Sequence, residues 1–454
     1  MAELIAKKRI SISKTLWLKY AVMFFVGLII GFRTVPSSVI GTVYMSSLFV
    51  CGWFGVRNKL DKFFTMLPFI CYMEVYMRGF IKSVPYLGIQ YMLIFVFGYL
   101  IISGFRKSKA HSYAFVLMIV YGFIEFLGGL FPDDPHLLRP VLVQSFALII
   151  MITWASFNRL SPVLIHKLLT NFKLAAVFLA GVVLVAHLRG GISYNSASNF
   201  ESSNGMAPVQ LSGYLGFGSI LLLISFMNPE ESLYKAIHLV LFAVCTSVMI
   251  LTFSRGGLYF VSVITLIYMY FNRASFRSYF KFIFFIPIGW GIYNYVVKET
   301  NGAIVKRYQR KEVANRDVLI VAGFKLFLDE PVFGVGTSNY TTQVVNRRYF
   351  SQSSTAHNEF VRAMAEHGLL GFFTYWLFFI LIFFEIIKRT GPNKEFSIYF
   401  LALFCLIIVH NGLKISIQPI LMMLAVANPN VVSIHKKIIN VFKPSIIQQL
   451  PQTS

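Results

Sequence analysis

The sequence predicts an all-α polytopic membrane protein with about 12 to 14 transmembrane helices. Of its 454 residues, 57% are hydrophobic and only 13% are charged, whereas soluble domains carry about 25% charged residues. The apolar residues occur in runs near the ~20 residues that a helix needs to cross a bilayer. Basic residues follow these runs in alternate loops, as expected when one set of loops is cytoplasmic.

About fourteen apolar segments can be recognised along the chain, although those near the N-terminus are short. Lys7, Lys8, Arg9 and Lys14 precede the first segment, which lacks a small-residue cleavage site and therefore indicates a membrane helix rather than a removed signal peptide. The segments centre on 16–32, 36–55, 63–80, 84–104, 112–131, 140–157, 172–188, 209–228, 234–253, 256–271, 280–297, 369–387, 396–411 and 416–432.

The formal net charge of +23 is explained by a membrane rather than by nucleic acid, because cytoplasmic loops collect Lys and Arg and the chain has no nucleic-acid motif. With the N-terminus placed inside, every short basic loop falls on the same side, which predicts cytoplasmic N- and C-termini. The clusters are Arg57/Lys59/Lys62, Arg106/Lys107/Lys109, Arg159/Lys167/Lys173, Lys235, Arg273/Arg277/Lys281, Lys388/Arg389/Lys394 and Lys436/Lys437/Lys443.

One long segment, from Lys298 to Ala356, interrupts the pattern on the outer side. Its part "NRDVLIVAGFKLFL" has apolar residues at helical spacing and ends at "DEPVFGVG". We therefore expect short helices in an outer loop rather than roughly sixty structureless residues. The chain is predicted to divide into a helix bundle (1–297), this loop (298–356), an active-site helix with C-terminal spans (357–435) and a cytoplasmic tail (436–454).

Neither the cysteines nor the acidic residues are grouped as metal ligands. Cys51, Cys71, Cys245 and Cys405 lie in apolar stretches without ligand spacing, and we expect them to be reduced core or lipid-facing residues. Asp133 and Asp134 occupy a different outer turn, and Asp329 and Glu330 precede Pro331 as a helix stop. The sequence therefore predicts no metal site and no cofactor.

Four basic residues face the predicted outer compartment: Arg189 in "AHLRGG", Arg255 in "TFSRGG", Arg316 in "NRD" and His357 in "TAHNEF". Ionisable residues at membrane level are costly and indicate function by default. Each also has a structural interpretation: Arg189 and Arg255 as interfacial anchors, Arg316 as a partner of Asp317 or Glu312, and His357 as a helix-start residue satisfied by backbone.

The residues after His357 favour a structural role. Glu359, Arg362 and Glu366 have i,i+3 and i,i+4 spacing, which predicts an exposed salt-bridge ladder on one face of a helix. His367 precedes Gly368 and is also expected to be structural. We expect these side chains to support the helix rather than to react.

Read together, "TFSRGG", "NRDVLIVAGFKLFLDEPVFGVGTSNY" and "AHNEFVRAMAEHGLLGFF" resemble the bacterial O-antigen ligase and O-antigen polymerase superfamily. Upstream, "NGMAPVQLSGYL", which contains Asn204, is similar to an Asn-containing loop-to-helix stretch of that family. The similarity covers roughly Arg189 to Phe373, and the earlier spans match only in being apolar. It implies a GT-C-like helix bundle and a membrane glycosyltransferase that uses polyprenyl-diphosphate-linked glycans.

The resemblance gives the polar residues chemical roles. Guanidinium groups bind phosphate through planar, permanently charged donors, so Arg189, Arg255 and Arg316 are predicted to clamp the diphosphate. His357 is predicted to be the general base that deprotonates the acceptor hydroxyl, in a metal-independent, inverting transfer. The supporting residues suggested by the same motifs are Asn358, Glu366 and Asn204.

The predicted function is polymerisation of lipid-linked repeat units into a surface polysaccharide, such as an O-antigen, capsule or exopolysaccharide. The alternative is a ligase that transfers the glycan to lipid A-core or another acceptor; a lipid-linked oligosaccharide flippase is a third, disfavoured reading. The implied partners are the donor, a glycan or lipid-core acceptor, the bilayer, and a chain-length regulator or flippase. The implied location is a bacterial inner membrane, with the site on the periplasmic or outer face.

Overall fold

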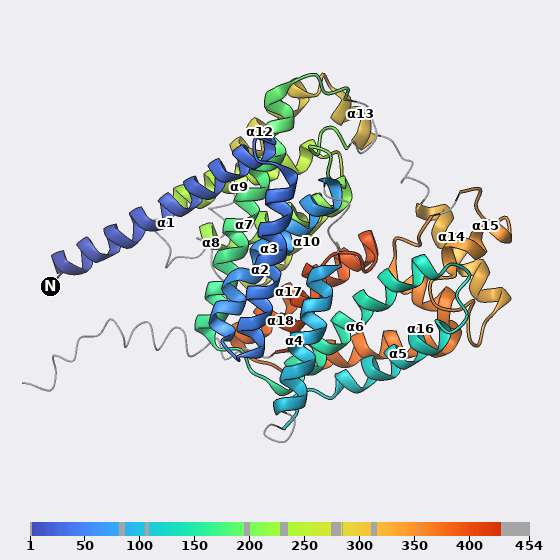
Figure 1. Cartoon of the computed structure of the whole chain (residues 1–454). Coiled ribbons are helices and arrows are strands. Elements are labelled where there is room, and N and C mark those ends of the chain that lie inside the picture. The colour runs from blue at the N-terminus through green and yellow to red at the C-terminus, as the bar shows by residue number, and fades with distance from the viewer. Residues whose placement is uncertain are drawn as a thin grey trace, which may run out of the picture.

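The computed structural model is helical throughout the part of the chain that it describes, residues 2–80, 87–104, 109–194, 200–227, 235–273, 283, 285–309, 316–352 and 354–427 (Figure 1). No strand occurs in these residues. Six helices within them are long and apolar enough to cross a membrane, and six shorter apolar helices of 10–17 residues accompany them. The prediction of an all-α polytopic membrane protein is therefore confirmed.

The helix boundaries follow the predicted apolar segments closely. The six long apolar helices are α2, α6, α7, α8, α16 and α17. The helices are α1 (Ala2–Gly31), α2 (Ser37–Val56), α3 (Leu60–Phe80), α4 (Gly88–Gly104), α5 (Ala114–Gly128), α6 (Pro135–Phe157), α7 (Pro162–Arg189), α8 (Pro208–Met227), α9 (Lys235–Leu251), α10 (Gly256–Phe271), α12 (Phe285–Glu299), α13 (Ala303–Gln309), α14 (Arg316–Asp329), α15 (Tyr340–Asn346), α16 (Glu359–Ile387), α17 (Gly391–Asn411) and α18 (Ile417–Val426).

Helices α7 and α8 form the centre of the bundle, with α1, α3, α9 and α10 packed around them. Small residues allow the closest of these contacts. A Cβ on Gly27 of α1 would lie 2.1 Å from the carbonyl oxygen of Phe178, and one on Gly181 of α7 would lie 2.5 Å from that of Phe24. The two backbones therefore touch, as is typical of small-residue interfaces between membrane helices.

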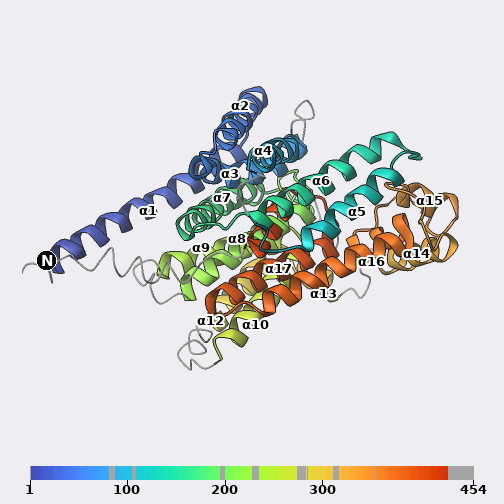
Figure 2. The same cartoon turned by 90° about the horizontal axis from the view of Figure 1, so that it is seen from below.

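A second group of helices, α5, α6 and α16, extends to one side of the bundle and carries α14 and α15 at its outer end (Figures 1 and 2). Helix α16 is interrupted at Gly368, whose backbone has φ +59° and ψ −149°. A Cβ at this glycine would lie 2.5 Å from the carbonyl of Val332, and the next amide, of Leu369, donates to the carbonyl oxygen of Pro331 at 2.8 Å. Glycine is thus required here by both conformation and space.

Several helix ends that carry predicted inner-loop residues meet one another. Lys167 pairs with Asp61, and Arg389 donates to the carbonyl of Val426 at 2.9 Å. Lys173, predicted to lie in an inner loop, is instead buried inside α7 and donates to Ser225 Oγ at 2.8 Å. Because this lysine is buried within the bundle, its basic charge says nothing about sidedness. The cytoplasmic placement of the termini stays a prediction.

The predicted outer segment contains the end of α12 and the short helices α13, α14 and α15. The stretch "NRDVLIVAGFKLFL" forms α14, as its apolar spacing predicts. The four-part division of the chain stays a prediction. The predicted loop residues Arg106, Lys107, Arg277 and Lys281, the pairing partner Glu312 and the tail 436–454 lie outside the described residues.

Candidate functional site

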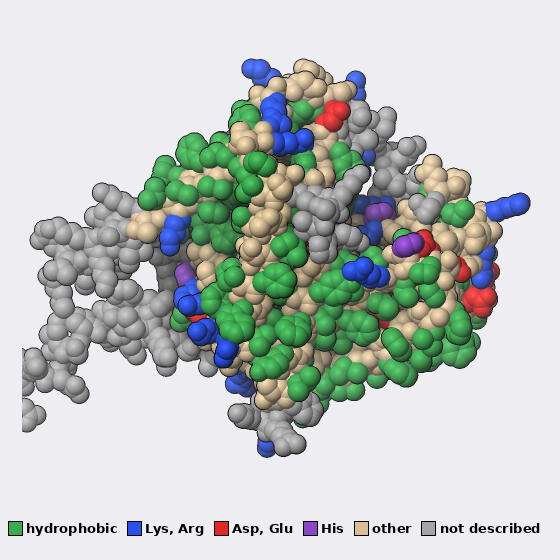
Figure 3. Space-filling view, viewed as in Figure 1, with side chains coloured by type: hydrophobic (Ala, Val, Ile, Leu, Met, Phe, Trp, Pro, Cys, Tyr) green, Lys and Arg blue, Asp and Glu red, His purple; other side chains and the backbone are tan. Residues whose placement is uncertain are grey.

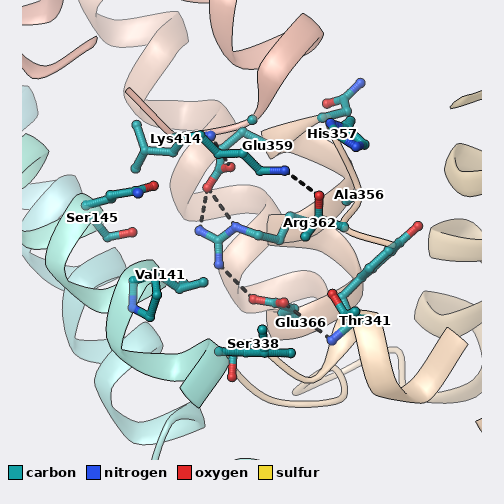
Figure 4. A pocket seen from close by; sticks show the side chains of 18 of the residues that line it. Val141, Ser145, Ser338, Thr341, Ala356, His357, Glu359, Arg362, Glu366 and Lys414 are labelled. Carbon is teal, nitrogen blue, oxygen red and sulfur yellow. Dashed lines mark hydrogen bonds and ion pairs between the residues drawn. The ribbon is translucent and has the colours of Figure 1, made fainter. Parts of the chain in front are cut away.

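A cavity of about 270 Å³ opens where the start of α16 meets the turn between α17 and α18. Its wall includes Arg78 from α3, Ser145 from α6, Thr341 from α15, and His357 and Lys414 from the segments that precede α16 and α18. Figure 4 shows this arrangement, with the α6 side chains facing the first turns of α16 across the cavity. The cavity thus brings together residues separated by more than three hundred positions of sequence.

The start of α16 places His357 at the cavity wall. Asn358 caps the helix, because its Oδ1 accepts hydrogen bonds from the amides of Phe360 at 3.0 Å and Val361 at 3.4 Å. His357 itself has φ +51°, a left-handed conformation that non-glycine residues rarely adopt and that often marks functional sites. Within the described part of the chain, its buried Nδ1 atom has no hydrogen-bond partner.

His357 is uncharged at neutral pH. Burial, followed by the positive charges of Lys414 and Arg316, lowers the pKa of its imidazole to about 3. A neutral ring with an unpartnered ring nitrogen is the form that can accept a proton. The predicted base is therefore in the required protonation state, and both cations that hold it there lie close to it.

Arg316, the first residue of α14, contacts the end of α17. Its Nη1 atom lies 2.6 Å from Nδ1 of His410. A guanidinium group can only donate, so Nδ1 of His410 accepts this bond and the imidazole holds the arginine fork in place. Burial, followed by the positive charge of Arg307, lowers the pKa of Arg316, so a second arginine is near.

Arg255 directly precedes the glycine at which α10 packs against the same histidine. It stands at the N-terminus of that helix and donates to the carbonyl of Arg307, whose own Nε donates to the carbonyl of Phe253 at 3.2 Å. A Cβ on Gly256 would lie 2.4 Å from the His410 ring, so only glycine allows α10 to approach α17 this closely. Arg255 is thus linked to Arg316 through Arg307, and Arg316 is the arginine whose charge acts on His357.

In the space-filling view, Lys or Arg and His side chains lie together in a hollow between the main bundle and the part that carries α14 and α15 (Figure 3). The residues that make up this basic site are Arg78, Arg255, Arg307, Arg316, His357, His410 and Lys414. Such a concentration of positive charge in a partly buried hollow is suited to a polyanionic group such as a diphosphate.

Arg189 and Asn204 lie apart from this basic site. Arg189 donates to the carbonyl of Phe32 and stacks its guanidinium 5.4 Å from the centre of that ring, and no described contact joins it to His410 or His357. Asn204 is buried, with φ +52°, and donates to the carbonyls of Gly31 at 3.2 Å and Val182 at 2.7 Å. It therefore links the ends of α1 and α7, and a role of Arg189 in the diphosphate clamp stays a prediction.

The predicted exposed ladder of Glu359, Arg362 and Glu366 is wrong in its exposure. Glu359 and Glu366 are buried, the Arg362 side chain is only 11% exposed, and the buried Glu125 of α5 joins them. Arg362 contacts all three carboxylates and lies 2.7 Å from Glu366 Oε2 (Figure 4), while Glu366 Oε1 accepts from the amide of Tyr340 at 3.4 Å. Helical spacing identifies the shared face, but α5 covers that face and makes the ladder a buried network.

Four residues of the basic site, Arg78, Arg307, His410 and Lys414, do not stand out in the sequence. Arg78 and His410 lie in the last turn of a predicted span, in the same kind of position that drew attention to Arg255. The pair His410–Asn411 also repeats the His–Asn of residues 357 and 358. Ionisable residues at membrane level indicate function by default, and this rule, applied to the end of every predicted span, identifies Arg78 and His410. Lys414 and Arg307 resemble ordinary loop cations, and no sequence signal distinguishes them.

An apolar groove begins beside the basic site. It has a volume of about 540 Å³ and is lined mainly by apolar side chains of α9, α10, α12 and α13. Tyr308 is part of its wall, and the Arg255 guanidinium lies 5.7 Å from the centre of the Tyr308 ring. A molecule with a hydrocarbon chain and an anionic head could therefore occupy the groove and the basic site together.

We expect an alkaline limit to activity that belongs to Lys414. Burial lowers the pKa of its ammonium to about 8. The negative charge of Glu359 acts in the opposite direction, and the positive charges of Arg78 and Arg316 add to the lowering. Above about pH 8 the lysine therefore loses the charge that would attract an anion, and kcat/KM should fall. Lys414→Arg keeps a charge that does not titrate in this range, so its pH profile should stay flat where that of the parent declines. An identical alkaline decline in both proteins would contradict this assignment.

Residues 239–376 of the chain match the family model described as O-antigen ligase. The matched segment contains Arg255, Arg316 and His357, and this match confirms the resemblance to the O-antigen ligase and polymerase superfamily that the motifs indicate. No curated protein matches the chain.

Proposed function

We propose that the chain, whose residues 239–376 match the family model described as O-antigen ligase, is a membrane glycosyltransferase that polymerises polyprenyl-diphosphate-linked repeat units. The observation that carries this proposal is the position of Arg316, which contacts His410 and acts on His357 by its charge, with Arg307 and then Arg255 next to it. A neutral base beside a cluster of guanidinium groups is what transfer from a diphosphate to a hydroxyl requires.

In the proposed reaction, the neutral imidazole of His357 accepts the proton of the acceptor hydroxyl as its oxygen attacks the anomeric carbon. The bond between that carbon and the diphosphate oxygen breaks, and its electron pair leaves with the diphosphate. Direct attack inverts the anomeric configuration. Arg255 and Arg316 stabilise the charge that grows on the leaving oxygen, and the negative donor also raises the basicity of His357 by offsetting the charges of Arg316 and Lys414.

The groove supports a lipid-linked donor. Its apolar wall suits an isoprenoid chain, and Tyr308 in that wall contacts Arg255, which could bind an attached diphosphate. We propose that the protein works in a bacterial inner membrane, with cytoplasmic termini and with this site at the outer leaflet. A chain-length regulator or a flippase is proposed as a partner, since the donor must first reach that leaflet.

Polymerase and ligase share this chemistry and differ in the acceptor. The test is to incubate the purified protein in proteoliposomes with the lipid-linked repeat unit as the sole glycan. A ladder of longer lipid-linked glycans supports the polymerase. A product that forms only after lipid A-core is added indicates the ligase, and movement of the donor across the bilayer without any new glycosidic bond indicates a flippase.

The two arginines should differ from ordinary surface cations in their response to substitution. Arg255→Ala and Arg316→Ala should each weaken donor binding and slow turnover, because phosphate charge is present before the bond breaks and increases as it does. Arg255→Lys and Arg316→Lys should restore activity only in part, since lysine lacks the planar fork. Full activity in both lysine variants would show that a positive charge alone is sufficient, and it would contradict the proposed arginine clamp.

Transfer should not depend on a divalent cation. The described residues hold no group of three His, Cys, Asp or Glu side chains placed to bind a metal ion. In our proposal, the guanidinium groups of the basic site neutralise the charge of the diphosphate instead. The rate of the purified protein should therefore be the same in EDTA as in magnesium. A large loss in EDTA that magnesium or manganese reverses would contradict the arginine clamp.

A further inference from the structure

Helix α14 is apolar on the face that packs on the protein and also on the opposite face. Leu319, Ala322 and Leu326 are buried against the protein, and Gly323 allows Val361 of α16 to come so close that a Cβ would lie 2.4 Å from it. The opposite face presents Val318, Val321, Phe324 and Leu328, each between 41% and 61% exposed. A helix that is apolar all round is normally covered on every side.

This outward face of α14 continues onto the lipid-facing side of α16. The turn after α14 exposes Val332 and Phe333, the latter to 75%, and the Pro331 carbonyl of the same turn accepts the amide of Leu369. From Leu369, exposed apolar residues continue along α16 through Leu370 and Phe373. Because α16 is long and apolar enough to cross a membrane, its exposed stripe is the surface that lipid covers.

We propose that α14 lies in the outer leaflet of the bilayer, with Val318, Val321, Phe324 and Leu328 in contact with acyl chains. The continuity with α16 identifies lipid as the occupant, since a single hydrophobic surface runs from the span onto the helix. The charged residues fit this placement at the edges of the face: Asp317 in the first turn and Lys325 on the flank, where its ammonium lies 5.3 Å from the centre of the Tyr349 ring. Helices that lie in the interface plane present an apolar face in this way.

This placement has a consequence for the basic site that holds whichever reaction the protein performs. Arg316 is the first residue of α14, so a helix held in the leaflet fixes the depth of that guanidinium. Its contact with His410 then places the end of α17 at the same level. The site is therefore aligned with the headgroup region, where the phosphate of any lipid-linked anion lies.

The test places a fluorescent NBD label on Phe324→Cys, or on Val321→Cys if the first variant does not fold, in the full chain reconstituted in nanodiscs. Asn346→Cys, at the exposed end of α15, is the matched control, and the parent chain measures labelling of the four native cysteines. We expect lipid brominated on its acyl chains to quench the label on α14 and aqueous iodide to leave it bright, with the opposite result at residue 346.

Two other results would overturn the proposal. Iodide quenching on α14 equal to that at residue 346 would show that the face is in water. A label shielded from both quenchers would show that protein covers the face, as in contact with a second copy of the chain. Neither result bears on glycosyl transfer, so the membrane contact and the proposed function fail independently.

Discussion

Replacement of His357 by Ala is expected to lower turnover by about 10²- to 10⁴-fold, the usual contribution of a general base, while donor binding stays nearly unchanged. The reason is that the uncharged imidazole at the cavity wall can take a proton but carries no charge that would hold the diphosphate. The measurement is single-turnover transfer with lipid-linked donor, together with donor binding measured separately. His136→Ala, on the exposed start of α6, is the matched control and should behave as the parent.

A second substitution separates chemistry from backbone effects at this position. Because His357 has a left-handed conformation, alanine adds a local cost that asparagine largely avoids. His357→Asn should therefore fold as well as the parent and still lose turnover to the same degree as His357→Ala. Substantial turnover in the asparagine variant would show that another group accepts the proton, and His410, which interacts electrostatically with His357, would be the first candidate.

Removal of Arg362 is expected to destabilise the protein by about 3–5 kcal/mol, the typical cost of removing one partner from a buried ion pair. Arg362→Met keeps much of the side-chain volume but leaves Glu125, Glu359 and Glu366 buried around an uncharged group. The measurement is the unfolding transition of the purified variant in detergent.

Arg347→Met provides the matched comparison. Arg347 pairs with Asp329 at 2.8 Å and Glu330 at 3.3 Å on a partly exposed surface, where ion pairs are worth about 0–1 kcal/mol. Its unfolding transition should therefore stay close to that of the parent. If Arg362→Met were equally stable but inactive, the buried network would have a direct part in substrate binding rather than a structural one.

The sequence identifies candidate site residues where a polar residue interrupts an apolar span. Arg255 and His357 stand next to spans, and Arg316 opens a segment of clear helical periodicity, so pattern and chemistry together identify them. The positions of these residues relative to one another could not be predicted, because they depend on how α10 packs against α17 at Gly256. His410 is one histidine at the end of a span, and only that packing shows that it holds Arg316.

The buried network illustrates a different limit. Spacing places Glu359, Arg362 and Glu366 on one helix face, but it carries no information about what covers that face. The covering helix α5 contributes Glu125 from more than two hundred positions upstream. A correct prediction of the helix therefore led to a wrong prediction of its surroundings, and the same holds for Lys173, whose partner Ser225 comes from a neighbouring span.

The break at Gly368 divides α16 into an outer segment that starts at Glu359 and an inner segment that ends at Ile387. The outer segment begins just after His357 and packs on α14, where Gly323 lies against Val361. The inner segment packs on α17, where Phe379 stacks on Phe404, and α17 in turn contacts α10, the helix that follows Arg255. The distance from the predicted base to that arginine therefore depends on how the outer segment packs on the end of α17, through contacts such as Glu359 with the Leu413 amide at 3.0 Å.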